Sequence, residues 1–366
     1  MTEIPEFEMP FPECGPSLTL PDAEAAMWCW IDDFELCPTQ AARDHMRRTN
    51  PAMLAALFFP RADATALTLA SQRLAWAFAV DDQFDNGGGI GSDPVRCKEA
   101  VVALLNSMRP ELGPPTSTLG RACADLWERS QEGRSSEWLK SIQQQMSAWL
   151  WSYYVDTVDR VVDRRPALWE FQQQRRHAFG AHWDADWCES VAGVNLPTSV
   201  RRHPGFRALR EALLDHKVLV NDIYSLDREL AAGHRHNTVL VIQHENGLSL
   251  SEAVEQVNLM ATACVQRVSK ALHELPGQLA AASISGQHYQ DALQVIEAYR
   301  DQLRGNFDYH AHGRRYEVER YDHPEELRSG TPAYTVDLLS VSGAPHGAPA
   351  PRRAPETVQE PTFGRR

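Results

Sequence analysis

The stretch LAWAFAVDDQFDNGGG, residues 74–89, ends an apolar helical segment with three carboxylates and then a run of glycines. On a helix, Asp81 and Asp85 share one face, whereas Asp82 points about 100° away. The carbonyl end of a helix is already partly negative, so each exposed carboxylate there costs about 0.3–1 kcal/mol. The placement therefore indicates a bound cation, and oxygen-only ligands suit Mg²⁺ better than a softer metal.

The pattern of apolar residues along the chain predicts helices almost throughout and hardly any strands. We therefore expect an all-α protein with one large domain over residues 21–325, an N-terminal arm over 1–20 and a disordered tail rich in Pro, Gly and Ala over 326–366. A domain linker at 110–115 is the alternative to a simple loop there. The predicted helices span residues 22–34, 64–85, 94–108, 117–130, 135–162, 167–191, 206–231, 250–273 and 286–309.

Composition narrows the class of protein. The net charge of −13 disfavours nucleic acid or an anionic membrane as the main partner. No apolar run approaches the roughly 18 residues of a membrane span, and the acidic N-terminus lacks the apolar core of a signal peptide. The seven cysteines are scattered without a CxxC pair, which favours a reducing, cytoplasmic location over a disulfide or zinc framework.

A second oxygen-rich segment, NDIYSLDREL, spans residues 221–230. Asn221, Ser225 and Glu229 are spaced at i, i+4 and i+8, which drifts by about 40° per step around a helix. Their amide oxygen, hydroxyl and carboxylate form one polar stripe of the kind that a hard cation accepts. A solvated helix face is the alternative for this stripe alone, but together with the carboxylates at 81–85 it favours a shared metal site.

Four motifs together resemble those of class I terpene synthases, specifically the microbial single-domain terpene cyclases. Residues 81–85 match the aspartate-rich DDxxD motif, and residues 221–229 match the NSE triad, ND(x)₂S(x)₂(K/R)E. RRHAFG at 175–180 resembles the segment that carries the family's diphosphate-sensing arginine. GNFDY at 305–309, followed by RY at 315–316, resembles the GNxDW…RY ending, with tyrosine in place of the usual tryptophan. The resemblance implies a single helical bundle around a deep apolar pocket.

The resemblance also implies a cofactor of three Mg²⁺ ions. Asp81 would bridge two of them, and Asp85 would be a supporting ligand. Asp82 would pair with Arg315 when the site closes. The third ion would be held by Asn221, Ser225 and Glu229.

Further roles carry over to the groups that handle the diphosphate. Arg176 is the candidate diphosphate sensor, because it precedes Gly180 by four residues as the family's sensor precedes its effector. Arg175 is the alternative if the register is off by one. Gly180 would be the effector, whose backbone carbonyl faces the carbocation, and Phe179 the linker between them. The expected diphosphate-binding residues are Arg176, Asn221, Arg228, Arg315 and Tyr316.

The chemistry sets a physical requirement for the pocket. Diphosphate leaves only when its developing charge is neutralised, which metal ions and bidentate arginines do. The carbocation left behind requires an apolar, closed and dry pocket. Aromatic faces stabilise such a cation by roughly 0.5–2 kcal/mol each, although ordinary core packing is the alternative for any single ring. The candidates are Trp76, Phe78, Phe179, Trp183, Trp187, Phe307 and Tyr309.

Other polar clusters have simpler interpretations. Asp184, Asp186 and Glu189 are predicted to form an acidic helix face and no metal site. His310 and His312 lack a third ligand at zinc-site spacing and are predicted to be surface histidines.

We therefore expect a Mg²⁺-dependent terpene cyclase, a carbon–oxygen lyase that ionises a linear isoprenoid diphosphate and releases a cyclic terpene plus diphosphate. Farnesyl diphosphate is the expected substrate, because single-domain microbial enzymes of this appearance are mostly sesquiterpene synthases. A diterpene synthase that uses geranylgeranyl diphosphate is the alternative. A chain-elongating prenyl diphosphate synthase would carry a second DDxxD at residue 221, and a non-catalytic helical binding protein would need a decayed site. Whether the enzyme is a homodimer is left open.

Overall fold

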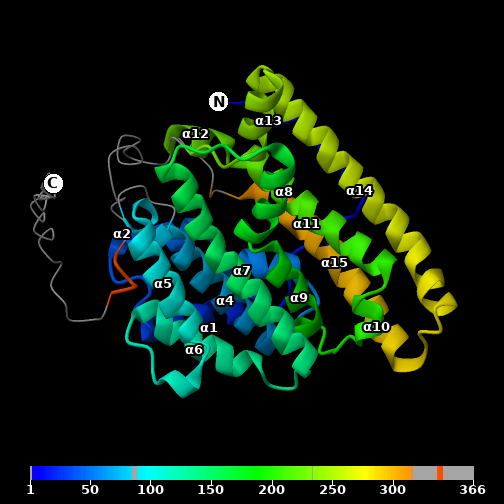
Figure 1. Ribbon diagram of the computed structural model, residues 1–366. Helices are drawn as coiled ribbons and strands as arrows, with labels where there is room; N and C mark the ends of the chain where they lie inside the picture. The colour runs from blue at the N-terminus through cyan, green and yellow to red at the C-terminus, as the bar shows by residue number, and fades with distance from the viewer. Residues whose placement is uncertain (1, 85–88, 233, 314, 316–335, 341–366) are drawn as a thin grey trace, which may run out of the picture.

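The computed structural model describes residues 2–84, 89–232, 234–313, 315 and 336–340 (Figure 1). Within these ranges the chain forms α-helices and two short 3-10 turns, and no β-strand. The prediction of an all-α fold is confirmed. None of the helices in the same ranges combines the length and the apolar character that crossing a bilayer requires.

The secondary structure follows the chain in a simple order. The elements are α1 (Leu20–Asp33), α2 (Gln40–Thr49), α3 (Pro51–Phe58), α4 (Ala64–Phe84), η1 (Ile90–Ser92), α5 (Pro94–Asn106), η2 (Pro110–Leu112), α6 (Thr118–Ser130), α7 (Ser136–Val161), α8 (Leu168–Ala178), α9 (Ala181–Val191), α10 (Thr198–Arg201), α11 (Pro204–Tyr224), α12 (Leu226–Ala232), α13 (Thr238–Asn246), α14 (Leu250–Ala281) and α15 (Gly286–His312).

Helices α4 and α11 position the two acidic motifs, which lie at or just beyond their C-terminal ends. Helix α4 runs through the middle of the bundle and packs against α1, α3, α6 and α9. Helix α11 packs along α14 and also contacts α9 and α15. Figure 1 shows α14 along one edge of the bundle, away from α5 and α6, with α15 behind α11. Helix α9 therefore touches both motif-bearing helices.

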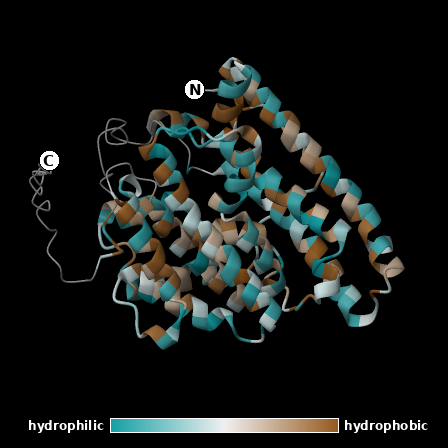
Figure 2. Ribbon diagram, in the orientation of Figure 1, coloured by the Kyte–Doolittle hydropathy of each residue, from teal (hydrophilic) through white to brown (hydrophobic). Residues whose placement is uncertain are grey.

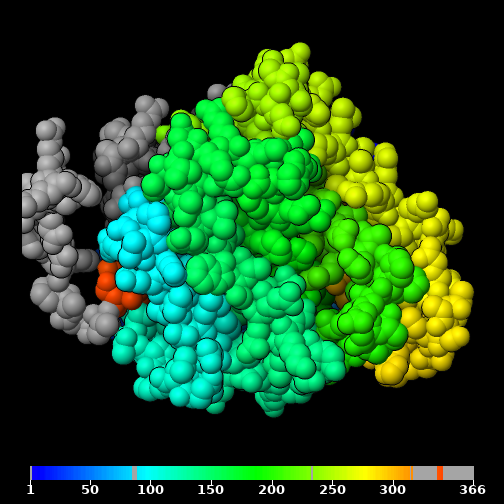
Figure 3. Space-filling model, in the orientation of Figure 1, coloured from blue at the N-terminus to red at the C-terminus, as the bar shows by residue number. Residues whose placement is uncertain are grey.

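Burial of apolar faces holds this arrangement together. Trp76, Trp138 and Phe58 are among the largest side chains that are fully buried in the main core. A second apolar cluster joins α11, α13 and α14 around Val239 and Val257. Figure 2 shows hydrophobic and hydrophilic residues mixed along each helix, as expected when one face is buried. In Figure 3 the green side chains of α7 to α9 cover the middle of the visible face.

Two predicted helices are interrupted beside functional residues. The predicted helix 167–191 is divided into α8 and α9 at Gly180, whose φ is +70°. A Cβ at this glycine would lie 2.4 Å from Trp183 Nε1, so the turn requires glycine. The predicted helix 206–231 is interrupted at Ser225, between α11 and α12. In contrast, the predicted helix 250–273 is longer than expected, because α14 continues through Pro276 to Ala281.

Apart from the single turn of α10, three helices, α2, α3 and α13, have no counterpart in the prediction. They are short, with 10, 8 and 9 residues, and a periodic pattern is hard to detect over two or three turns. Their starts do carry a local signal, because the side chains of Thr39, Asn50 and Asn237 each accept a hydrogen bond from a backbone N–H of the first turn.

Residues 336–340 pack against the core, which differs from the prediction of a disordered tail over 326–366. Gln83 Nε2 donates to the Val336 carbonyl at 2.9 Å, and the Leu338 amide donates to Gln83 Oε1 at 3.1 Å. The Leu119 amide at the start of α6 donates to the Leu338 carbonyl at 3.1 Å. Since Gln83 lies within the first acidic motif, this segment is anchored directly beside it. The rest of the predicted tail lies outside the described residues.

The predicted N-terminal arm also contacts the core before α1 begins at Leu20. Phe7 stacks on Tyr224 with ring centroids 5.8 Å apart. The Thr2 hydroxyl donates to Asp227 Oδ1 at 2.7 Å. The arm therefore lies along the segment that carries the second motif.

Candidate active site

Asp81 presents a partly exposed carboxylate at the end of α4. The Tyr153 hydroxyl on α7 donates to Asp81 Oδ1 at 2.8 Å, and Arg315 Nη2 lies 3.4 Å from Asp81 Oδ2. The Asp81 side chain is 29% exposed. Asp85 and Tyr316 lie outside the described residues, so their roles stay predictions. Asp81 is thus oriented by its neighbours while its carboxylate remains open to solvent.

Asp82 is buried against α2. His45 Nε2 lies 3.1 Å from Asp82 Oδ2. Burial opposes ionisation, but the charges of His45, Arg315 and Arg228 outweigh it and hold the pKa of Asp82 below its usual value. Asp82 therefore anchors the basic groups around the first motif. No motif in the sequence indicated that His45 would contact Asp82.

The second motif stays helical through the interruption between α11 and α12. The Ser225 amide donates to the Asn221 carbonyl at 2.8 Å, and the Glu229 amide donates to the Ser225 carbonyl at 2.9 Å. Asn221 and Ser225 are buried. These i to i+4 hydrogen bonds keep Asn221, Ser225 and Glu229 on one face. The polar stripe that the spacing predicts is therefore present in the fold.

Glu229 is held in a position where its negative charge is poorly compensated. Asn237 Nδ2 donates to Glu229 Oε2 at 2.9 Å. Burial, helped by the Asp222 carboxylate, raises the pKa of Glu229 to about 7, although Arg175 acts in the opposite direction. A cation bound beside Glu229 would favour its ionised form. Asn237 was not predicted to belong to the site.

Arg175 faces the second motif, and Arg176 does not. Arg175 Nη2 donates to Asp222 Oδ1 at 2.6 Å and to Asn221 Oδ1 at 3.0 Å. Arg176 Nε donates to Asp215 Oδ1 at 2.6 Å, further back on α11. Neighbouring residues on a helix point about 100° apart, so one arginine faces the motif and the other does not. The placement of Arg176 at the site is therefore corrected to Arg175, the alternative register.

Asp222, next to Asn221 in the chain, organises this side of the site. It is fully buried and accepts hydrogen bonds from Arg175 and from the Thr238 amide at 2.8 Å. Asn237 Nδ2 also donates to the Asp222 carbonyl at 2.7 Å. Asp222 thus fixes Arg175 and the start of α13 relative to α11.

Helix α15 connects the two motifs. His310 Nε2 lies 3.2 Å from Asn221 Nδ2. Burial, with the nearby charge of Arg315, lowers the pKa of His310 to about 4. Arg315, whose charge acts on His310, also approaches Asp81, so polar groups from this part of the chain lie beside both motifs. The prediction that His310 is a surface residue is wrong, since it is only 5% exposed.

The donor atoms fit a hard divalent cation. Asp81, Asn221, Ser225 and Glu229 offer only oxygen atoms, which is the set that Mg²⁺ accepts. Among the described residues, no group of three or more His, Cys, Asp and Glu side chains is arranged for a metal. The reason is that the second motif supplies an amide and a hydroxyl, while Asp85 lies outside those residues.

The turn between α8 and α9 changes the expected roles of Gly180 and Phe179. The Gly180 carbonyl accepts the Asp184 amide at 3.2 Å, which begins α9. That carbonyl is therefore already engaged in a helix. If the sensor is Arg175, the position four residues later is Phe179, which caps the end of α8 and is half-buried.

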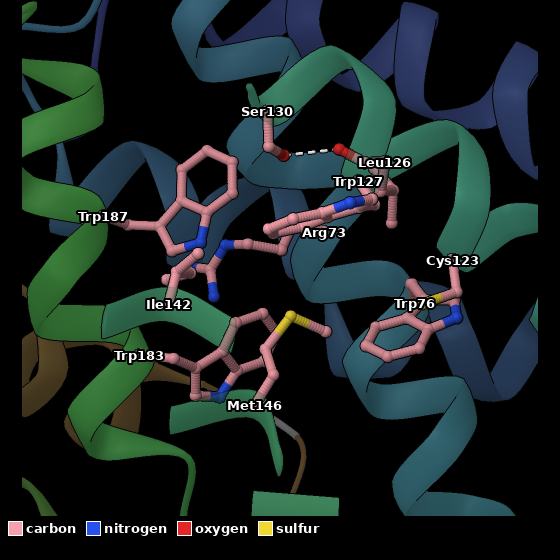
Figure 4. A pocket seen from close by; sticks show the side chains of 10 residues that line it. All are labelled: Arg73, Trp76, Cys123, Leu126, Trp127, Ser130, Ile142, Met146, Trp183 and Trp187. Carbon is pink, nitrogen blue, oxygen red and sulfur yellow. Dashed lines mark hydrogen bonds between the residues drawn. The ribbon is translucent and has the colours of Figure 1, made fainter. Parts of the chain in front are cut away.

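The aromatic candidates divide into two groups, of which the first lies deep in the bundle. Trp76, Trp183 and Trp187 line a cavity of about 20 Å³ together with Arg73, as Figure 4 shows. Trp149 on α7, which the sequence did not indicate, stacks on Trp183 with ring centroids 5.1 Å apart. These rings form an aromatic base below the first motif.

The second group lies nearer the motifs or in the packing of α15. Phe78 lies under the Arg315 guanidinium, whose Cζ is 4.2 Å from the ring centroid. Phe307 meets Phe7 edge-on at 5.6 Å. Tyr309 is buried, and its hydroxyl donates to a backbone carbonyl of α2.

The GNFDY segment, residues 305–309, allows α15 to pack closely against its neighbours. A Cβ at Gly305 would lie 2.1 Å from the Leu57 carbonyl oxygen, so only glycine lets α15 cross α3 at this distance. Asn306 Nδ2 lies 3.5 Å from the Lys217 carbonyl oxygen on α11. This segment therefore sets the position of α15 against α3 and α11.

The acidic residues of α9 are buried, which corrects their prediction as an acidic helix face. Asp186 pairs with Arg210 at 2.6 Å, and Glu189 pairs with Arg201 at 2.5 Å. The physical reason is the position of α9, which contacts α4, α7 and α11 and has little solvated surface. Asp184 has two basic partners, described below.

Comparisons with known proteins identify the family. The family model described as terpene synthase family 2, C-terminal metal binding, matches residues 72–267, more than half of the chain. (2Z,6E)-Hedycaryol synthase from Kitasatospora setae is 33% identical over 322 residues, which cover 87% of this chain and 93% of that enzyme. A relative from Streptomyces viridochromogenes, named 7-epi-alpha-eudesmol synthase ((2E,6E)-farnesyl diphosphate cyclizing), is 25% identical over 346 residues, covering 93% and 100%.

A solved structure supports the same assignment. The structure described as hedycaryol apo matches with a TM-score of 0.75 and 31% identity, over 84% of this chain and 99% of that one. The chain therefore belongs to terpene synthase family 2 and is a microbial class I terpene synthase, an enzyme of the terpene cyclase type.

Proposed function

We propose that this enzyme is a Mg²⁺-dependent sesquiterpene synthase that ionises farnesyl diphosphate and cyclises the resulting carbocation. The catalytic domain in this proposal spans residues 21–325. The observation that carries the proposal is the single rim formed by Asp81, Arg315, His310 and Asn221. Two oxygen-ligand sets and two arginines meet there, which is what binding of a metal–diphosphate complex requires.

Different residues of the rim would bind the metal ions and the diphosphate during ionisation. Asp81 on one side, and the triad at 221–229 on the other, would hold the metal ions. When bound, Mg²⁺ supplies positive charge that stabilises the departing diphosphate. Arg175 and Arg315 would grip diphosphate oxygens through their planar guanidinium groups. Arg228, which acts on Asp82, would contribute further positive charge.

We assign the sensor role to Arg175 and the effector role to the Phe179 carbonyl. Arg175 now holds Asn221 and Asp222, so a diphosphate that attracts its guanidinium would loosen these two hydrogen bonds. Such an exchange would pull on the C-terminal part of α8, where Phe179 sits. The Gly180 carbonyl is the weaker candidate, because it already accepts the Asp184 amide.

The space below the rim would shelter the carbocation from water. Tyr153 and Trp149 on α7 lead downward from Asp81 to the aromatic base, with ring centroids 5.6 Å apart. Apolar and aromatic walls exclude water, which would otherwise quench the cation. The C15 chain is favoured because a relative is named for cyclising (2E,6E)-farnesyl diphosphate, and geranylgeranyl diphosphate is the alternative.

Incubation with geranyl, farnesyl and geranylgeranyl diphosphates, followed by gas chromatography–mass spectrometry, tests the proposal. We expect a cyclic C15 product from farnesyl diphosphate with Mg²⁺ and none with EDTA. A product from geranylgeranyl diphosphate alone would make the enzyme a diterpene synthase. Lack of turnover of all three substrates would contradict the proposal.

A matched pair of variants separates the metal site from general charge effects. Glu229→Gln removes a proposed ligand, and we expect a higher Mg²⁺ concentration for half-maximal rate. Glu255→Gln changes an exposed glutamate on α14 and should leave the Mg²⁺ titration unchanged. An unaltered titration for Glu229→Gln would count against the triad.

A further inference from the structure

Three charged side chains meet in the interior below the rim. Arg73 Nη1 donates to Asp184 Oδ1 at 2.8 Å, and Lys217 Nζ donates to Asp184 Oδ2 at 2.9 Å. Arg73 is 2% exposed, Asp184 6% and Lys217 0%. We call this group the base triad. A buried carboxylate placed between two cations leaves one positive charge without a matching negative one.

Among the described residues, the acidic neighbours of Asp184 on α9 do not supply the missing negative charge. Asp186 is paired with Arg210, and Glu189 is paired with Arg201. His216, next to Lys217, stays neutral, because burial lowers its pKa to about 3. Burial also lowers the pKa of Lys217, whereas its hydrogen bond to Asp184 opposes that shift.

The base triad lies on the same helices as the rim. Lys217 precedes Asn221 by one turn on α11, and Arg73 precedes Asp81 by two turns on α4. At 1.5 Å per residue, these offsets are about 6 and 12 Å along the helix axes. Asp184 lies one turn into α9, beside the interruption at which α8 ends. The triad is therefore displaced by one to two helical turns from the proposed metal ligands.

The aromatic rings around the triad already have protein cations on them. Arg73 Cζ is 4.5 Å from the Trp183 ring centroid and 4.9 Å from that of Trp187, and Figure 4 shows the guanidinium between these indoles. Lys217 Nζ is 4.2 Å from the Phe58 ring centroid. A ring face that holds one cation has less to offer a second one.

We propose that the base triad is a specificity determinant: its surplus positive charge confines the substrate carbocation to the upper part of the pocket. This inference rests on the proposed function. Like charges repel over several ångströms in a protein interior. Positive charge on the distal isoprene unit is therefore disfavoured at the base. The substrate chain must fold back so that its distal double bond lies near the diphosphate end when charge develops on it.

The structure of each product shows which carbon carried the positive charge when the carbocation was quenched. The carbon next to the new double bond, or the carbon that carries a new hydroxyl, marks the cation that was quenched. Removing the surplus charge should thus raise the share of products quenched at distal carbons relative to those quenched nearer the diphosphate end. A unit charge at roughly 10 Å from a distal carbon and roughly 15 Å from a carbon nearer the diphosphate end corresponds to about a threefold change in this ratio.

Four variants separate charge from shape. Arg73→Met and Lys217→Met each leave a neutral pair with Asp184, although the two residues lie on different helices and touch different rings. Arg73→Lys and Lys217→Arg keep the charge and alter the shape. We expect the two neutral variants to shift the product ratio in the same direction by about threefold, and the charge-retaining variants to give the wild-type ratio.

The measurement is the product ratio from farnesyl diphosphate by gas chromatography–mass spectrometry, with diphosphate release measured in parallel. The proposal would be overturned in favour of local packing by either of two results. One is a shift of the product ratio in opposite directions in the two neutral variants. The other is a shift in the charge-retaining variants as large as that in the neutral ones. If one neutral variant does not fold, the other and its charge-retaining partner decide. If the wild-type enzyme releases no diphosphate, the proposed function fails instead.

Discussion

The rim and the base of the site differ in how their charges are paired. At the rim, acidic side chains share arginines that have more than one partner. At the base, the single carboxylate of Asp184 is held between two cations. Asp81 is 29% exposed, and Arg175 divides its donors between Asn221 and Asp222. Lys217 at the base is 0% exposed. The rim is therefore suited to exchanging protein partners for metal and diphosphate.

The base has the opposite property. Its charges cannot be rehydrated or re-paired without moving three helices, so its electrostatic field is constant during a reaction cycle. We infer from this difference that the rim controls whether ionisation occurs and that the base influences what happens afterwards. The following predictions test this division, beginning with the largest effect.

Removal of the Asp81 carboxylate should affect the rim most strongly. Asp81→Asn should lower kcat by roughly 10³-fold, about 4 kcal/mol in barrier height, because one proposed metal ligand is lost. The melting temperature should change little, since the side chain is partly exposed and Tyr153 can still donate to the amide oxygen. Steady-state kinetics and circular dichroism melting measure the two effects. Turnover within tenfold of wild type would place the metal elsewhere.

The two adjacent arginines provide a matched comparison within the rim. Arg175→Gln should lower kcat by roughly 10²-fold, because it removes the proposed bidentate contact with the diphosphate. Arg176→Gln should cost less than about threefold, since its ion pair with Asp215 is only partly buried and faces away from the second motif. Single-turnover rates with farnesyl diphosphate compare the pair. If Arg176→Gln were the more damaging change, the assignment of the sensor to Arg175 would be wrong.

The anchoring of the first motif can be tested by two truncations. Ending the chain after Ser340 should leave activity unchanged, because residues 336–340 keep their contacts. Ending it after Glu326 removes the partners of Gln83 and should lower kcat by about tenfold and the melting temperature by a few degrees. Equal activity of the two truncated proteins would show that these contacts do not position Asp81 and Asp82.

The smallest effect concerns pH and the interior near the base. Burial lowers the pKa of His216 to about 3, below the value of about 6.5 in an unfolded chain. Between these values the unfolded state binds more protons, so the stabilising contribution is complete above pH 6.5 and is lost as the pH falls. The slope is about 1.4 kcal/mol per pH unit for one such histidine.

The variant His216→Leu isolates this contribution. Both ring nitrogens of His216 are buried without a hydrogen-bond partner in the described part of the chain, so leucine removes no bond that is seen there. Urea unfolding at pH 7.5, 6 and 5 should show a shallower loss of the free energy of unfolding for the variant than for wild type. Parallel curves would mean that His216 does not titrate on unfolding.

The sequence was sufficient for the parts of the site that depend on local spacing. The i, i+4, i+8 pattern places Asn221, Ser225 and Glu229 on one face, and backbone hydrogen bonds keep it there. The sequence alone could not show whether Arg175 or Arg176 faces the second motif. Both are arginines on one helix, and only the packing of α8 on α11 decides which one faces the motif.

The base triad could not be predicted from the sequence, for a related reason. Asp184 was predicted to belong to a solvated helix face, because a carboxylate in a polar segment usually is solvated. Its partners are contributed by α4 and α11, far from it in the chain. Similarly, the packing of residues 336–340 depends on Gln83, and nothing in their own composition predicts a contact.

The same triad has a consequence for the way this protein reaches its native state. Arg73 and Asp184 are 111 residues apart, and Asp184 and Lys217 are 33 apart. No local segment can neutralise any of these ions, so each keeps its hydration until α4, α9 and α11 meet. Collapse of the interior must therefore wait for a contact of long sequence separation, which is slow to form. Chains waiting at this stage expose apolar helix faces, so the yield of folded enzyme should improve when synthesis is slowed.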